Sequence, residues 1–163
     1  MRRLILQMGV SIDGYVAALD GSHPWGEGSE DEAFKRWILD SVWAAGAHLM
    51  GRVTYEEMAA FWPTSTSEYA RPMNEIPKVV FSKGGATFDQ ALSRLGLVDE
   101  YRLMIQPAAL GAGLPLFKEL AAPLHLELVE ATTYTSGVAI HVYRPRSTPA
   151  DQPVDPDQPE QVG

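Results

Sequence analysis

Two glycine-containing segments carry residue types that can bind phosphate. Gly51, Arg52 and Thr54 follow one short apolar run, and a second segment consists of Gly84, Gly85, Ala86 and Thr87. If a helix begins at each segment, its free backbone amides favour an anion, and glycine lets a phosphate approach the backbone. The alternative is that the glycines only make tight turns and Thr54 only caps a helix. Two such segments together favour a pyrophosphate, although neither has the longer glycine pattern of a Rossmann or P-loop site.

The segment Ser11-Ile12-Asp13-Gly14 places a carboxylate directly after the first apolar run. Asp13 could hydrogen-bond a substrate amide or relay a proton. Alternatively, Asp13 is a turn residue whose side chain bonds nearby backbone before Gly14. Its position in the sequence alone favours the turn.

Three aromatic residues close together, Tyr55, Phe61 and Trp62, could stack on a planar heterocycle or could face the core. The chain has four histidines, which share no short ligand spacing, and no cysteine. We therefore expect no metal site and no cysteine nucleophile.

Alternating strands and helices must position these residues. Apolar runs predict strands over residues 4–8, 47–50, 78–82 and 101–106, and helical spacing predicts helices over 30–45, 54–62 and from Phe88 to Gly96. Thr54 and Glu57 fit a capping box, so we expect the second helix to begin at Thr54. Residues 124–129 and 138–143 predict a C-terminal hairpin. The sequence therefore predicts an α/β domain with a mostly parallel central sheet, an antiparallel edge hairpin, and helices on both faces.

The length of 163 residues indicates one domain, which we place at residues 1–146, followed by a tail over 147–163. The tail is rich in proline, has four acidic residues and no Lys or Arg, and is predicted to be disordered. The net charge of −8 argues against binding to nucleic acid or to an anionic membrane. Neither a membrane span nor a signal peptide is indicated, so we expect a cytoplasmic protein.

Six segments together resemble the reductase domain of bacterial riboflavin biosynthesis and the stand-alone dihydrofolate reductase-like proteins related to it. They occur in the order typical of that family, between residue 4 and about residue 143. The segments are residues 11–17 (SIDGYVA), 49–56 (LMGRVTYE), 77–83 (PKVVFSK), 84–87 (GGAT), 96–101 (GLVDEY) and 107–117 (PAALGAGLPLF). Each segment alone is weak evidence for the resemblance, but the set of six is specific for this family.

This resemblance implies a dihydrofolate reductase-like fold, NADPH as the hydride donor, and a homodimer. It assigns Gly51, Arg52 and Thr54 to the cofactor phosphates, Ser82 and Lys83 to the adenosine ribose phosphate, and Gly84, Gly85, Ala86 and Thr87 to the pyrophosphate. It also places Leu110, Gly111 and Gly113 beside the pocket, with Ser11 and Asp13 toward the nicotinamide and the substrate. The substrate in the family is a pyrimidine or a pteridine-like ring, as in the 5-amino-6-(5-phosphoribosylamino)uracil reductase of riboflavin biosynthesis.

One junction departs from the family pattern, because Lys83 is followed directly by Gly84. In similar proteins roughly forty residues separate the two segments, enough for a helix and the strand that delivers the double glycine. Apolar side chains in a buried strand contribute about 1.5 to 3 kcal/mol each, a large part of the stability of a domain. We therefore expect the missing strand to be present, either as residues omitted from this numbering or from a partner chain.

Together these observations predict an NADPH-dependent reductase of a small heterocyclic substrate. The protein would act mainly by positioning the nicotinamide C4 against an electrophilic C=N or C=O carbon, with Asp13 orienting the substrate or relaying its proton. One alternative is a non-catalytic ligand-binding protein that keeps the fold. Another is a flavin or nucleotide binder that uses the same two helix ends.

Overall fold

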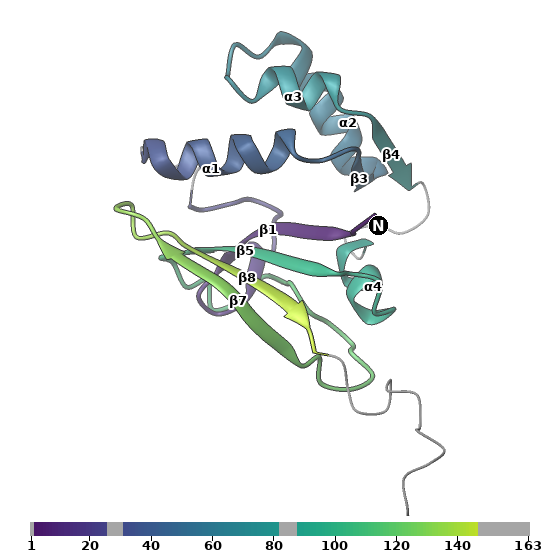
Figure 1. Cartoon of the computed structure of the whole chain (residues 1–163), viewed down its shortest axis with the longest axis vertical. Coiled ribbons are helices and arrows are strands. Elements are labelled where there is room, and N and C mark those ends of the chain that lie inside the picture. Colours follow the sequence, from purple (N-terminus) through teal and green to yellow (C-terminus); the bar gives the residue numbers. More distant parts are fainter. Residues whose placement is uncertain (1, 26–30, 82–87, 147–163) are drawn as a thin grey trace, which may run out of the picture.

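A four-stranded sheet forms the centre of the protein. The computed structural model describes residues 2–25, 31–81 and 88–146. The sheet has the order β1 (Ile5–Ser11), β5 (Glu100–Gln106), β8 (Ala139–Pro145) and β7 (Leu126–Thr133) (Figure 1). β1 runs parallel to β5, whereas β8 runs antiparallel to both of its neighbours. The predicted α/β fold with an antiparallel C-terminal hairpin at the edge is confirmed.

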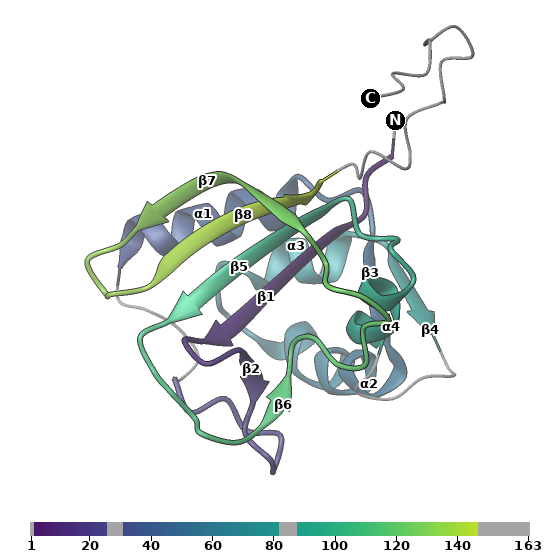
Figure 2. The ribbon, with the colours of Figure 1, turned by 90° about the horizontal axis from the view of Figure 1, so that it is seen from below.

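One face of this sheet is covered by the first long helix, which lies behind the sheet in Figure 2, and a shorter helix packs against the other face. α1 (Glu32–Trp43) begins after Asp31, whose carboxylate accepts hydrogen bonds from the amides of Ala33 and Phe34. Phe34 then packs in a buried cluster with β8 residues, including Ile140, which is fully buried. On the other face, Leu92 of α4 (Phe88–Arg94) packs against the cluster that contains Tyr101. The burial of these apolar side chains holds the helices on the sheet.

A second, smaller sheet lies on the β1 side of the main sheet (Figures 1 and 2). It pairs β3 (His48–Gly51) with β4 (Lys78–Phe81) in parallel, from His48 opposite Lys78 to Gly51 opposite Phe81. The connection between the two strands contains α2 (Arg52–Phe61), a 3₁₀ turn (Trp62–Thr64) and α3 (Ala70–Glu75). Among the described residues, no strand pairs with both β1 and β3, so the two sheets are not continuous.

A short antiparallel pair extends from the end of β1. β2 (Tyr15–Ala17) pairs with β6 (Leu114–Pro115), and Gly14, with a φ of +88°, makes the turn between β1 and β2. The sequence pattern did not predict either strand, because elements of two or three residues have no measurable periodicity. The pair matters because it places the loop before β6 next to the end of β1.

The predicted start of α2 at Thr54 was wrong. The helix begins at Arg52, its N-cap is Gly51 in an extended conformation, and no side chain caps it. Thr54 is therefore the third helical residue, and no described hydrogen bond joins it to Glu57 as a capping box requires. Among the described residues, no side chain accepts from the amides of the first turn.

None of the helices found in the described part of the chain could cross a membrane. The longest, α1, has 12 residues, whereas a bilayer span needs about 20 apolar residues.

Candidate functional site

The candidate site begins at the end of β1, where the strand turns sharply into β2. Ser11 is the last residue of β1 and is 2% exposed, whereas Asp13 in the turn is exposed. The Ser11 hydroxyl donates to Asp13 Oδ1 at 2.6 Å and accepts the backbone N–H of Tyr15 at 2.9 Å. Ser11 therefore fixes the direction of the Asp13 side chain.

The Asp13 carboxylate joins this turn to a loop that is distant in the sequence. Oδ2 accepts the backbone N–H of Gly111 at 2.7 Å, and both oxygens are 3.1 Å from the amide nitrogen of Leu110. The backbone N–H of Ile12 donates to the carbonyl of Ala108 at 2.9 Å, which adds a second connection. The structure thus brings Ser11 and Asp13 together with Leu110 and Gly111, residues that the sequence analysis placed around one pocket.

The hydrogen bond from Ser11, followed by the backbone hydrogen bond from Gly111, lowers the pKa of Asp13 below its ordinary value of 3.8. Asp13 is therefore ionised at neutral pH, and its oxygens already accept hydrogen bonds from three groups. This environment suits a carboxylate that positions a loop. It does not suit a carboxylic acid that donates a proton at neutral pH.

Glycine is required in this loop for two different reasons. Gly111 has a φ of +70°, which side chains other than glycine rarely adopt. A Cβ atom on Gly113 would lie 2.3 Å from the carbonyl oxygen of Ala17 and 3.2 Å from the Tyr15 ring. Close contact between the loop and β2 therefore depends on the absence of a side chain at residue 113.

An apolar cavity of about 190 Å³ lies beside the turn, on the α4 face of the sheet. Its walls come from the ends of β1 and β5 and from the segment after β6, and they are Val10, Ser11, Ile12, Gly14, Leu103, Ile105, Leu116 and Phe117. The carboxyl ends of parallel strands are where ligands bind in open α/β sheets. Leu103, Ile105 and Phe117 were not predicted as site residues. The apolar pattern of Leu103 and Ile105 predicts a strand but not which of its faces borders a cavity, and Phe117 belongs to a segment singled out only for its resemblance to the family.

The start of α2 is a second candidate binding position. Gly51 has no side chain to cover the first-turn amides, and a helix of ten residues directs its positive end there. Arg52 is exposed and donates from Nη1 to Glu56 Oε1 at 2.9 Å, one turn along the same helix. Arg52 is therefore accessible to an anion beside the positive end of this helix.

Other predicted site residues are placed differently. Phe61 and Trp62 form an edge-to-face pair with ring centroids 4.8 Å apart, and Tyr55 is exposed on α2. No hydrogen bond or ring contact between described residues links these three aromatics to Ser11 or Asp13. Six predicted cofactor residues, Ser82, Lys83, Gly84, Gly85, Ala86 and Thr87, lie outside the described residues, as does the Lys83–Gly84 junction.

Comparison with protein families gives a match over most of the chain. The model of the family described as RibD C-terminal domain matches residues 2–83 and 82–140, as two stretches that meet at residues 82–83. A curated relative, the uncharacterized protein YyaP of Bacillus subtilis (strain 168), is 26% identical over 183 aligned residues, covering 87% of this chain and 94% of YyaP. Since 87% of 163 residues is about 142, about 40 of the 183 aligned positions face a gap in this chain.

Solved structures with low sequence identity share the fold. A putative riboflavin biosynthesis protein from Shewanella sp. PV-4 has a TM-score of 0.65 at 19% identity, covering 90% of this chain and all of the other. A deaminase/5-amino-6-(5-phosphoribosylamino)uracil reductase from Thermotoga maritima has a TM-score of 0.61 at 14% identity, covering 89% and 57% of the two chains. Dihydrofolate reductase from Enterococcus faecalis, complexed with NADP(H), has a TM-score of 0.55 at 14% identity, covering 89% and 97%.

Proposed function

Because this chain belongs to the RibD C-terminal domain family, we propose that it is an NADPH-dependent reductase of a small heterocyclic substrate with a pyrimidine or pteridine-like ring. The observation that carries this proposal is the apolar cavity at the carboxyl ends of β1 and β5, bordered by Ser11. An apolar cavity with a few polar groups at its edge suits a flat ring that carries amide-like substituents.

At the start of α2, the described residues fit the phosphate groups of the cofactor. The start of α2 directs the backbone amides of its first turn and the exposed Arg52 toward the proposed phosphates of the dinucleotide, and its N-cap residue is a glycine, which has no side chain. When bound, NADPH supplies a hydride. The solved reductases with this fold include one whose complex contains NADP(H), which supports the same choice here.

The role that we propose for Asp13 is to position the loop over residues 107–113. Its ionised carboxylate holds the amides of Leu110 and Gly111, so the loop keeps a fixed place beside the cavity. Ser11 holds the carboxylate from the other side. These contacts, all to Ser11 and to backbone amides, support the alternative of a turn residue that bonds backbone over the predicted roles of orienting the substrate or relaying its proton.

A second candidate function is supported by the division of the sheet. β1 and β3 have no common partner strand among the described residues, and the segment expected at the pyrophosphate follows Lys83 directly. A protein that keeps the fold without a complete cofactor groove would bind a ligand at the cavity of β1 and β5 without reducing it.

NADPH binding distinguishes the two candidates without knowledge of the substrate. At a concentration of 100 times Kd, NADPH adds about 2.7 kcal/mol to the stability of the protein. For a chain of this size this corresponds to an increase of about 5 to 10 °C in melting temperature. No increase with NADPH at millimolar concentration would favour the non-catalytic ligand-binding protein.

A further inference from the structure

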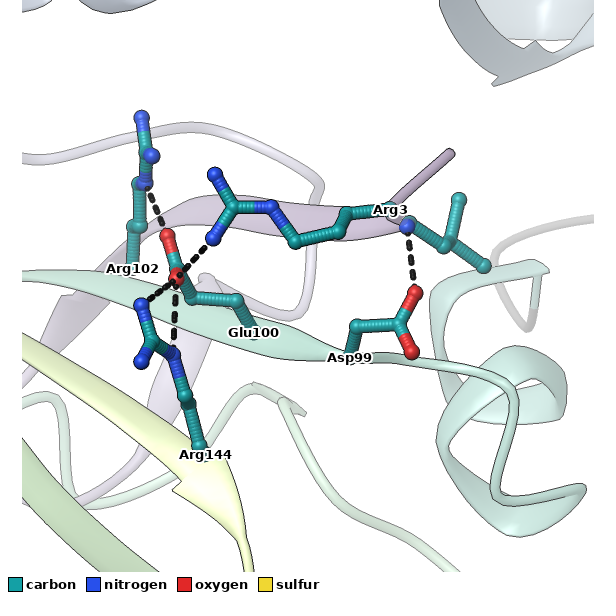
Figure 3. Close-up of polar contacts among 6 residues, drawn as sticks. Arg3, Asp99, Glu100, Arg102 and Arg144 are labelled. Atoms are coloured by element: carbon teal, nitrogen blue, oxygen red, sulfur yellow. Dashed lines mark hydrogen bonds and ion pairs between the residues drawn. The ribbon is translucent and has the colours of Figure 1, made fainter. Parts of the chain in front are cut away.

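A buried carboxylate is surrounded by three arginines (Figure 3). It lies at the start of β5, at the end of the sheet opposite to the turn that contains Asp13. Glu100 is the first residue of β5, and its side chain is 3% exposed. Its Oε1 accepts from Arg102 Nε at 2.8 Å. Its Oε2 accepts from Arg3 Nη1 at 3.3 Å and from Arg144 Nε and Nη2 at 3.1 and 3.0 Å. The three guanidinium groups thus converge from the start of the chain, from β5 and from β8.

One carboxylate does not balance three guanidinium groups. The neighbouring Asp99 directs its carboxylate to the backbone N–H of Leu4 at 2.7 Å and makes no ion pair with the three arginines among the described contacts (Figure 3). Each guanidinium carries five N–H groups, and the bonds to Glu100 use one from Arg3, one from Arg102 and two from Arg144. In the described part of the chain, no other acceptor binds the remaining N–H groups.

These donors border a cavity of about 220 Å³ on the α1 face of the sheet. The lining residues are Arg3, Trp37, Glu100, Arg102, Val129, Glu130, Val142 and Arg144. Three of them are cationic and two are anionic, so the cavity has a positive excess in a chain whose net charge is −8. Trp37 and the two valines add apolar surface beside the donors.

Neutralising the charge of Glu100 does not require three arginines. A single arginine can pair with a carboxylate through two parallel hydrogen bonds, which satisfies the charge of the buried group. Arg3 and Arg144 are 54% and 50% exposed, so large parts of both side chains remain accessible beside the cavity. The surplus of charge and donors is therefore available to a ligand.

We propose that this cavity binds a small organic anion, with a carboxylate or phosphate group on Arg3, Arg102 and Arg144 and a flat apolar body against Trp37. This site is separate from the proposed reductase site. Glu100 and Gln106 are at opposite ends of β5, about 20 Å apart, and the two cavities lie on opposite faces of the sheet. An anion bound here does not compete for the cavity beside Ser11.

Calorimetric titration with inorganic phosphate and with benzoate at low ionic strength tests the proposal. We expect saturable binding of both probes, and Arg144→Gln should weaken it by about 10-fold or more, because a charge-assisted contact is lost. Arg94→Gln is the matched control, since Arg94 is similarly exposed but lies on α4 on the opposite face, and it should leave binding unchanged. Trp37→Leu should weaken benzoate binding more than phosphate binding. Arg3→Gln provides a second variant if Arg144→Gln does not give a native circular dichroism spectrum.

The anion could come from a free small molecule or from the acidic tail of the chain. A full-length variant in which Asp151, Asp155, Asp157 and Glu160 become Asn or Gln distinguishes these two sources. Tighter phosphate binding by this variant than by the wild type would show that the tail competes for the site and would overturn the assignment to a free organic anion, whereas equal binding would support that assignment. The proposal is overturned if neither protein binds phosphate or benzoate saturably, or if Arg94→Gln weakens binding as much as Arg144→Gln.

Discussion

At the scale of single residues, Asp13 connects two segments that are 97 positions apart in the sequence. Its carboxylate accepts from Ser11 and from the amides of Leu110 and Gly111, which fixes the loop at the proposed active site. In Asp13→Asn only one side-chain oxygen remains to accept these bonds. We expect faster hydrogen exchange of the Leu110 and Gly111 amides, measured by mass spectrometry or NMR.

Asp20→Asn is the control for this change, because Asp20 is also exposed and accepts from the amide and hydroxyl of Ser22 in another loop. It should leave the exchange of Leu110 and Gly111 unchanged. The pKa of Asp13 is lowered by the hydrogen bond from Ser11 and then by that from Gly111. Its contribution to the stability of the folded protein is therefore present above the unfolded pKa near 3.8 and is lost as the pH falls through the lower folded pKa. Exchange that is equally slow in wild type and Asp13→Asn at neutral pH would exclude the positioning role.

Arg52 is the residue whose substitution tests the cofactor position directly. Its ion pair with Glu56 is exposed and contributes about 0.3 to 0.5 kcal/mol, so Arg52→Ala should cost little stability. A contact with a cofactor phosphate contributes about 1.5 to 3 kcal/mol, so the affinity for NADPH should fall roughly 10- to 100-fold. Arg71→Ala removes a similar exposed pair with Glu75 on α3 and should not change NADPH affinity. If calorimetric titration with NADPH gives the same affinity for Arg52→Ala as for the wild type, Arg52 does not contact the cofactor.

At the scale of elements, the contact between β2 and the loop before β6 depends on Gly113. In Gly113→Ala the new Cβ would lie 2.3 Å from the carbonyl oxygen of Ala17, so the backbone of one segment must move. We expect a loss of about 1 to 3 kcal/mol in the free energy of unfolding, measured by urea titration. Gly46→Ala is the control, since nothing lies within 4 Å of its added Cβ, and it should change stability by less than about 0.5 kcal/mol. Equal free energies of unfolding for the two variants would show that the contact between β2 and this loop tolerates a side chain at residue 113.

The elements with strong patterns were predictable from the sequence, and the short ones were not. The apolar run and helical spacing predicted β1, β5 and α1, because burial on a sheet or a helix face imposes those periods. The start of α2 was predicted two residues late, because Thr54 and Glu57 fit a capping pattern, whereas Gly51 takes the N-cap without a side chain. The sequence also identified Asp13, but the partners of its carboxylate, Leu110 and Gly111, became visible only when the sheet brought the two loops together.

At the scale of the whole molecule, the described residues contribute no strand to the position between β1 and β3. Within the ranges 2–25, 31–81 and 88–146, β1 pairs only with β5 and β3 only with β4, both in parallel, and the two sheets lie next to each other without pairing (Figure 2). Parallel sheets normally have their strands covered on both sides, and unpaired edges promote association with other chains. In the smaller sheet Leu49, Val79 and Phe81 are between 38% and 45% exposed, so this sheet keeps apolar side chains exposed.

The comparisons with known proteins also indicate that a segment is missing between β4 and α4. The family match divides into two stretches at residues 82–83, and about 40 aligned positions of YyaP face a gap in this chain. A strand and its helix are the content expected of a segment of that length, and the chain passes from β4 to α4 at this point.

We therefore predict that a further strand fills the position between β1 and β3 in the working protein. It is supplied either by residues between Lys83 and Gly84 that this sequence omits or by a partner chain, because open edges on two parallel sheets would leave unpaired amides and apolar side chains in water. Intact-mass spectrometry of the purified protein distinguishes the two sources, since extra residues raise the mass above 17.9 kDa. Light scattering then shows whether a chain of 17.9 kDa associates, and hydrogen exchange shows whether the amides of β1 and β3 are protected in that assembly. A monomer of 17.9 kDa that unfolds cooperatively would contradict the prediction, and it would favour the non-catalytic ligand-binding protein over the reductase.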